Sequence, residues 1–227
     1  MKASHIQFAK LVAVTALLFC SRPGIAQQTS CKPDYFTVLD FANEPSVWSP
    51  DLSKRIRLLK DLTIRVEANG KDVGAIKLPY EDDEPVNTFI KWSDDSGAFY
   101  VLIGSNAIDG QTIAYEMLGD ELRELQAPKA VAQEFAKHHS CQTRGNNLYA
   151  IRWEQNSHQL LLMAEVYPTS DCGREMGFSE GYVAEAATGK ILKRYTSTQI
   201  EAMLRECWPD KLLDGADNNT PRKAKDK

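Results

Sequence analysis

Beyond its first 26 residues, the sequence lacks an apolar run long enough to span a bilayer. It also lacks a phosphate-binding glycine loop, a paired-cysteine zinc motif and a dinucleotide-binding fingerprint. We therefore expect no cofactor and no bound metal. The sequence also lacks an excess of positive charge, because its formal net charge is −4. An acidic surface disfavours nucleic acid and anionic membranes and modestly favours basic protein partners.

The N-terminal segment has the pattern of a secretory signal peptide. Lys2 and Lys10 supply positive charge, residues 11–20 form a short apolar core, and Gly24-Ile-Ala26 provides small residues for cleavage. We expect cleavage after Ala26, giving a periplasmic or secreted chain of 201 residues with a formal charge of −7 and no transmembrane segment. The bulky Phe19 disfavours lipidation of Cys20.

Cysteine positions predict two disulfides in the exported chain. Residues 148–153 and 159–167 are β-prone and flank a turn at 155–158, which predicts a hairpin. Cys141 and Cys172 are equidistant from that turn, so the hairpin would bring them together. A Cys141–Cys172 bond leaves Cys31 to pair with Cys207.

A tryptophan pattern occurs three times along the chain. In each copy a Trp is followed three residues later by an Asp or Asn that can form an Asx turn, and then by an apolar strand. The copies are residues 47–59, 88–102 and 149–163. A second hairpin follows each copy, turning at Asn69-Gly70, Gly119-Asp120 and Thr188-Gly189. The result is three antiparallel four-stranded repeat units, at about 45–80, 87–126 and 147–195, in one β-rich domain spanning 27–213.

Trp48-Ser-Pro-Asp51 and Trp92-Ser-Asp-Asp95 resemble the Trp-Ser-Pro-Asp signature of bacterial periplasmic β-propellers of the TolB type. The Trp48 to Trp92 spacing of 44 residues suits one blade. The resemblance implies propeller-like blades. Because closed propellers have roughly 4–8 blades, we expect an incomplete or open arrangement, with a β-sandwich as the alternative. We interpret the three repeat tryptophans as core residues, since they recur at one structural position.

Two helices are expected among the strands. The first is inserted between the second and third units and runs from Pro128 to His139. The second is C-terminal, begins with a capping box of Thr198 and Glu201, and ends at Pro209. Residues 214–227 are polar, and we expect them to be disordered.

Two groups of residues offer catalytic chemistry. Ser179 lies in Gly177-Phe-Ser-Glu-Gly181, which matches the G-x-S-x-G pattern of a nucleophile elbow but lacks its strand–turn–helix context. Glu134, His138 and His139 lie near one helix end and could form a metal site or an acid–base pair, although no third metal ligand is evident. We interpret the serine as a turn residue and the histidines as a polar helix end.

The acidic run Glu81, Asp82, Asp83 and Glu84 lies between the first and second units. It is either a solvated connection or a docking site for a basic partner. From the whole sequence we expect an exported binding or interaction module of the cell envelope, without catalytic activity, that recognises a protein through inter-strand loops such as 81–84 and 105–110. One alternative is a periplasmic inhibitor or immunity-type protein for a basic enzyme. The other is a hydrolase that uses Ser179 or the Glu134, His138 and His139 group.

Overall fold

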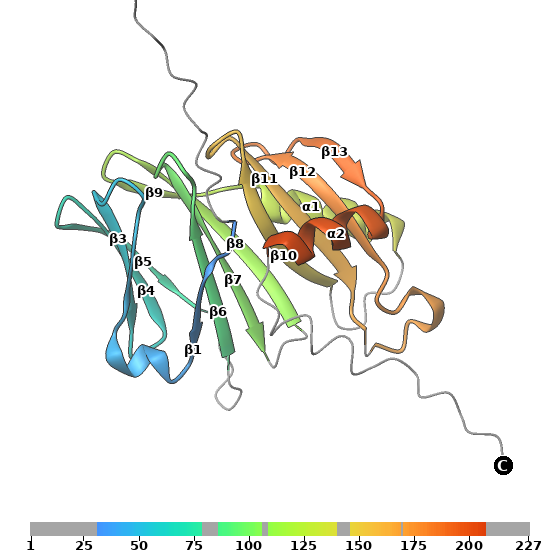
Figure 1. Ribbon diagram of the computed structural model, residues 1–227, viewed down its shortest axis with the longest axis horizontal. Coiled ribbons are helices and arrows are strands. Elements are labelled where there is room, and N and C mark those ends of the chain that lie inside the picture. The colour runs from blue at the N-terminus through green and yellow to red at the C-terminus, as the bar shows by residue number, and fades with distance from the viewer. Residues whose placement is uncertain (1–30, 79–85, 106–108, 140–145, 169, 208–227) are drawn as a thin grey trace, which may run out of the picture.

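The computed structural model describes residues 31–78, 86–105, 109–139, 146–168 and 170–207. Within these residues the chain is mainly β, with three antiparallel sheets and two α-helices, and the sheets do not close into a barrel. The sheets follow one another across the molecule in chain order (Figure 1). This confirms the predicted fold class.

The first sheet is a meander of β2 (Ser46–Trp48), β3 (Lys54–Leu59), β4 (Thr63–Ala68) and β5 (Lys71–Lys77). Its strands pair in sequence order. The predicted hairpin turn at Asn69-Gly70 is present, and both residues have positive φ, at 50° and 77°. This conformation is the one a two-residue type I′ turn requires, and Asn followed by Gly adopts it at low cost.

The second sheet contains β6 (Val86–Trp92), β7 (Ala98–Ser105), β8 (Asp109–Leu118) and β9 (Glu121–Glu124). A fifth strand, β1 (Asp34–Thr37), pairs antiparallel with β6 and extends this sheet at its other edge. The short 3-10 helix η1 (Asp40–Asn43) links β1 to the first sheet and buries Phe41. The N-terminal part of the described chain therefore covers the edge of β6.

The third sheet is the meander β10 (Asn146–Glu154), β11 (Gln159–Val166), β12 (Ser179–Glu185) and β13 (Ile191–Tyr195). Glu154 and Gln159 are register partners, which confirms the predicted hairpin with its turn at 155–158. The 3-10 helix η2 (Gly173–Glu175) lies in the connection from β11 to β12.

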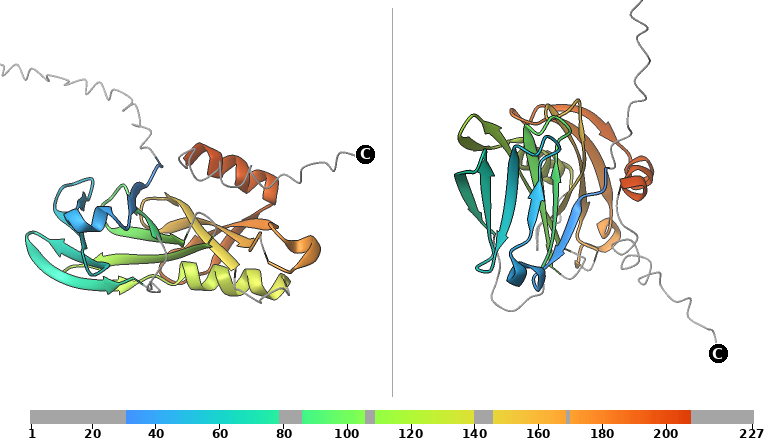
Figure 2. Two further views of the ribbon diagram at one scale, coloured as in Figure 1. Left: turned by 90° about the horizontal axis from the view of Figure 1, so that it is seen from below. Right: turned by 60° about the vertical axis from the view of Figure 1, so that its left-hand side comes forward.

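Helix α1 (Ala127–His138) and helix α2 (Ser197–Cys207) lie on opposite faces of the third sheet (Figure 2). The predicted cap of α2 is wrong by two residues. Thr196 precedes the helix, and its backbone N–H donates to Oε1 of Gln199 at 3.1 Å, so Thr196 and Gln199 replace Thr198 and Glu201 as the capping pair. Within the described residues, no helix is long and apolar enough to cross a membrane.

Three groups of buried side chains hold these layers together. One fills the space between the first and second sheets and includes Ile56, Ile64, Val101 and Trp92. The second joins the third sheet to α1 and to Tyr100 of the second sheet. The third packs Leu161, Met163 and Val183 against Ile200 of α2. Each sheet is thus fixed to the next by buried apolar contacts.

The Cys31–Cys207 disulfide is present, with a Cα–Cα distance of 5.0 Å. It joins the residues just before β1 to the end of α2 across a sequence separation of 176. Cys172 is also disulfide-bonded. Cys141, its predicted partner, lies outside the described residues.

Candidate binding surface

The turns after Trp48 and Trp92 have the same pattern of side-chain hydrogen bonds. In the first sheet, Ser49 Oγ donates to Asp51 Oδ1 at 2.7 Å, and the carboxylate accepts the backbone N–H of Ser53 at 3.0 Å. In the second sheet, Ser93 Oγ donates to Asp95 Oδ1 at 2.6 Å, and the backbone N–H of Gly97 donates to the same oxygen at 3.0 Å. The Asx turns predicted at Asp51 and Asp95 are therefore present. The third turn is built differently, with positive φ at Gln155 and Asn156 and a backbone hydrogen bond from His158 to Gln155.

These turns also join neighbouring sheets. The backbone N–H of Asp51 donates to Ser96 Oγ of the next turn at 3.0 Å. Ser157, in the β10–β11 turn, donates its hydroxyl to Asp95 Oδ2 at 2.7 Å. Burial acts to raise the pKa of Asp95, but hydrogen bonds from Ser93, Gly97 and Ser157 outweigh it and leave this pKa lowered. The ionised carboxylate thus bridges the second and third sheets.

Two of the three repeat tryptophans make the same contact with the preceding sheet. Trp92 Nε1 donates to the backbone oxygen of Val47 at 3.4 Å. Trp153 Nε1 donates to the backbone oxygen of Lys91 at 3.2 Å. Val47 and Lys91 each directly precede a repeat tryptophan, so the two junctions between sheets are equivalent.

The first of the three tryptophans differs from the others. Trp92 is 3 % exposed, as predicted for a core residue, but Trp48 is 50 % exposed. The prediction of a core position is wrong for Trp48, because no described sheet precedes the first one and covers it. Its indole has no hydrogen bond within the described part of the chain and instead lies under the guanidinium of Arg55, 5.4 Å from the ring centroid.

Trp48 belongs to the outer face of the first sheet, the face turned away from the second sheet. Register pairing places Arg55, Glu67 and Asp72 in one row with Trp48, since these residues are successive cross-strand partners. Arg55 Nε lies 2.6 Å from Glu67 Oε2, and Arg57 Nη1 lies 3.4 Å from Glu67 Oε1. These arginines lower the pKa of Glu67, chiefly through the hydrogen bond from Arg55.

The strands of this outer face carry more cations than carboxylates. The cations are Arg55, Arg57, Arg65 and Lys77, and the carboxylates are Glu67 and Asp72. These side chains sum to a formal charge of +2, or +1 when Glu44 at the rim is included, in a chain whose formal charge is −4. Glu44 reaches Arg57 from the rim of the face, at 3.3 Å. Sequence composition hid this basic area, because it depends on strand register.

The predicted docking run Glu81, Asp82, Asp83 and Glu84 lies outside the described residues, as do residues 106–108 of the other predicted loop. The strand ends that precede and follow these loops are described. Val86 at the start of β6 and Ser105 at the end of β7 are register partners. The two loops therefore leave the second sheet at the same end.

Ser179 is buried at the start of β12 and is the register partner of Glu165 in β11. It shares a sheet face with Gly181, two residues along the strand. A Cβ on Gly181 would lie 2.6 Å from Ile200 Cδ1 of α2, so this face is the one that α2 covers. Ser179 is therefore on the α2 side of the third sheet.

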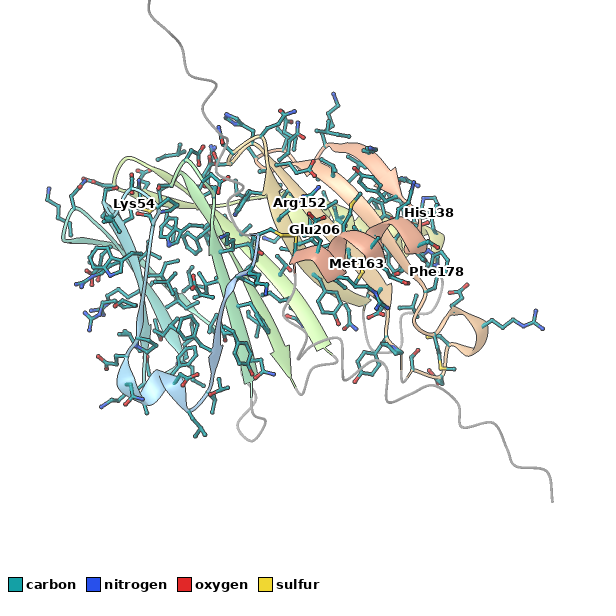
Figure 3. The ribbon with its side chains drawn as sticks, in the orientation of Figure 1. Lys54, His138, Arg152, Met163, Phe178 and Glu206 are labelled. Atoms are coloured by element: carbon teal, nitrogen blue, oxygen red, sulfur yellow. A yellow bond between two sulfur atoms is a disulfide. The ribbon has the colours of Figure 1, made fainter. Side chains whose placement is uncertain are left out.

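The predicted acid–base group lies on the α1 side. Glu134 Oε2 accepts from Lys137 Nζ at 3.0 Å, and His138 Nε2 lies 3.4 Å from Glu134 Oε1. Glu134 also pairs with Arg194 of β13. The pKa of Glu134 is lowered, chiefly by the hydrogen bond from Lys137. This network ties α1 to the edge strand, at the far end of the molecule from Lys54 in the first sheet (Figure 3).

His139 lies just beyond α1, between two aromatic rings. Its ring centroid is 4.3 Å from that of Phe135 and 4.7 Å from that of Phe178. Its Nδ1 is 4.0 Å from Glu175 Oε2. Since Phe135 packs on the α1 face of the third sheet, His139 and Ser179 are on opposite sides of that sheet.

Sequence reasoning missed the partly buried carboxyl group of Glu165. Burial raises its pKa to about 7, against a hydrogen bond from Asn147 that lowers it, and the nearby Glu201 of α2 raises it further. Asn147 Nδ2 donates to Glu165 Oε2 at 3.1 Å. Successive residues of a strand face opposite sides of the sheet, so Glu165 faces the same side as Leu161 and Met163. Its place on this apolar side was the sign of burial available in the sequence.

Among the described residues, no three His, Cys, Asp or Glu side chains are grouped so that they could hold a metal ion. Comparison with known proteins finds no matching family model, no similar curated protein and no similar solved structure.

Proposed function

We propose that this chain is an exported binding module of the cell envelope that recognises a protein partner without catalysing a reaction. The recognition elements are inter-strand loops carried by a rigid set of sheets. Loops on a rigid scaffold are common positions for binding residues, because the scaffold fixes where each loop begins and ends.

The observation that carries this proposal is the register pairing of Val86 with Ser105. It supports a shared recognition site, since the loops that precede β6 and follow β7 start from adjacent backbone positions. The second sheet that bears them is packed on the first sheet through one buried cluster and on the third sheet through another. Glu81 to Glu84 would give this site an acidic character suited to a basic partner.

Affinity capture from the envelope fraction of the producing cells tests this proposal. The tagged mature chain is compared with a variant in which Glu81 to Glu84 are replaced by Ser, and with a control in which Asp120 and Glu121 of the β8–β9 turn are replaced. We expect the same envelope protein with the wild type and the control, and its loss with the loop variant. Unchanged recovery would reject the loop as the docking site. A result with no specific envelope protein would reject the binding function.

Export is part of the proposal and has its own measurement. The Cys31–Cys207 disulfide supports an oxidising compartment, because such bonds form and persist outside the cytosol. Intact-mass analysis of the exported chain should show an N-terminus at Gln27. Accumulation of the full chain with residues 1–26 inside the cytosol would contradict export.

The inhibitor or immunity-type function is the narrower form of the same proposal, and the charge of the 81–84 run is its support. It requires that the captured partner be a basic enzyme whose activity falls when the purified chain is added. The hydrolase alternative has less support, because Ser179 and His139 lie on opposite sides of the third sheet.

We infer further that the three sheets are repeat units of the TolB-type blade. The equivalent Ser–Asp turns and the equivalent indole contacts support this relation. A chain in which such blades stop at three would expose its first blade, as Trp48 is exposed.

A further inference from the structure

We infer that the outer face of the first sheet is a second docking surface, and that its partner is an acidic protein that lays a β-strand against Trp48. The surface is defined by Trp48, Arg55, Arg57, Arg65 and Lys77. It is separate from the loops of the proposed function, and the inference does not depend on them.

The two junctions inside the chain show what a tryptophan at this position binds. In both, the indole N–H donates to a backbone carbonyl of the preceding sheet, from Val47 to Trp92 and from Lys91 to Trp153. A β-strand supplies that acceptor in each case. The position therefore selects a protein backbone rather than a sugar or a nucleobase.

Trp48 occupies the equivalent position without a preceding sheet. It is the first residue of its Trp-Ser-x-Asp turn, and that turn has the same internal hydrogen bonds as the turn after Trp92. Half of its surface is exposed, and Arg55 holds the ring by stacking on it. An indole that is already ordered loses little conformational freedom when a partner covers it.

Charge identifies the partner as acidic. The face carries a net +1 with Glu44 included, although the chain as a whole is acidic. Arg55 and Arg65 have side-chain exposures of 35 % and 42 %, so each can take a second carboxylate beside its internal one. Arg57 already pairs with both Glu44 and Glu67. Tryptophan and arginine are also the residues most enriched among those that dominate binding energy at protein interfaces.

A second copy of this chain fits the surface poorly. Head-to-tail addition would place the third sheet against the first, but α1 and α2 cover both faces of the third sheet (Figure 2). Face-to-face pairing of two first sheets would bring together two surfaces of the same positive charge, which is unfavourable. An acidic partner of different sequence avoids both problems.

Site-specific photocrosslinking in the producing cells locates the surface. The full chain carries p-benzoylphenylalanine in place of Trp48 or, as a control, in place of Leu192, which is 45 % exposed on the edge strand β13. We expect a discrete crosslinked species from position 48 that is absent at position 192, and mass spectrometry should identify it as a protein with net negative charge. No crosslink at 48, the same crosslink at 192, or a crosslink to a second copy, a basic protein, a nucleic acid or a polysaccharide would each overturn the inference.

Binding of that purified protein then tests the named side chains. Trp48→Ser should weaken binding by roughly tenfold or more, as expected for a central aromatic contact, and Arg65→Gln should weaken it less. Raising the salt concentration should weaken the binding of the wild-type chain, because salt screens the attraction between opposite charges. The variant with Ser at positions 81–84 should bind like the wild type. Unchanged affinity for Trp48→Ser, with an unchanged melting temperature, would overturn the inference while leaving the proposed loop function intact.

Discussion

The first and third sheets are both four-stranded meanders, yet their surroundings differ completely. The third sheet lies between α1 and α2, and the Cys31–Cys207 disulfide fixes the end of α2. Among the described residues, the first sheet is covered on one face only, and its other face presents Trp48 with ion-paired arginines. Within the described residues, the outer face of the first sheet is therefore open to a partner, whereas both faces of the third sheet are covered.

This difference shows that the same local pattern can serve two purposes. Trp48 and Trp153 occupy the same position in their copies of the repeat, but Trp153 donates its indole N–H to the second sheet and Trp48 has no described sheet to receive its own. What covers each residue decides whether it stabilises the fold or remains available for binding.

The largest expected effect on stability comes from the disulfide that fixes the end of α2. Replacing Cys31 and Cys207 together by Ala removes a crosslink across 176 residues. The chain-entropy model puts the loss in the free energy of unfolding at about 5 kcal/mol, before any compensating relief of strain. Urea unfolding of the variant and of the oxidised wild type measures this loss as the difference between their free energies of unfolding. Amide exchange should rise more in α2 than at Ile56 and Ile64 of the first sheet. Equal loosening of both sheets would contradict the comparison.

A pH-dependent effect is expected at Glu165 in the third sheet. Because its folded pKa is about 7 and its ordinary value is 4.5, the folded chain retains a proton that the unfolded chain loses between these values. The free energy of unfolding should therefore fall as pH rises through this window, by about 3 kcal/mol in total.

Glu165→Gln should remove that loss, so the variant should match the wild type near pH 4 and exceed its stability near pH 8. Glu121→Gln, at the exposed start of β9, is the control and should leave the pH profile unchanged. Parallel profiles for Glu165→Gln and wild type would show that this carboxyl is not held neutral by burial.

Two glycines sharpen the comparison between the sheets. A Cβ on Gly181 of the third sheet would meet Ile200 of α2 at 2.6 Å, whereas a Cβ on Gly74 of the first sheet would meet Leu122 at an ordinary 3.4 Å. Gly181→Ala should destabilise the protein by about 1–3 kcal/mol through overpacking, and Gly74→Ala should change stability by less than about 0.5 kcal/mol. Chemical unfolding of both variants gives the two values. Similar costs would mean that α2 does not press on the third sheet as described.

The smallest effects distinguish the tryptophans themselves. Trp92→Phe loses a buried hydrogen bond and some packing, so it should cost about 1–2 kcal/mol. Trp48→Phe should cost almost nothing in the isolated chain, because half of its surface is exposed and its indole N–H has no described acceptor. Thermal unfolding under identical conditions compares them.

Much of this fold could be predicted because its turns have strong local chemistry. Asn69-Gly70 and Gly119-Asp120 specify tight turns, and the Ser–Asp pairs after Trp48 and Trp92 form hydrogen bonds within a few residues. Once these turns are fixed, the meanders follow. The Cys31–Cys207 bond followed from the even number of cysteines beyond residue 26 and the placement of the hairpin.

Features that depend on distant elements could not be predicted in the same way. Thr196-x-x-Gln199 and Thr198-x-x-Glu201 overlap in sequence and both suit a helix cap, so packing of α2 on β12 decided between them. The exposure of Trp48 and the burial of Glu165 depend on which element covers each sheet face. For the binding loops, Glu81 to Glu84 lie outside the described residues, and their docking function stays a prediction.

Indole hydrogen exchange in the purified mature chain tests most directly whether the outer face of the first sheet is uncovered. The chain has four tryptophans, so a two-dimensional NMR spectrum should contain only four indole N–H signals. Single Trp→Phe variants assign each signal to its residue. We predict that the N–H groups of Trp92 and Trp153 exchange slowly and that the N–H of Trp48 exchanges within the dead time. Protection of Trp48 equal to that of Trp92 would contradict an uncovered first sheet and, with it, the docking surface inferred there.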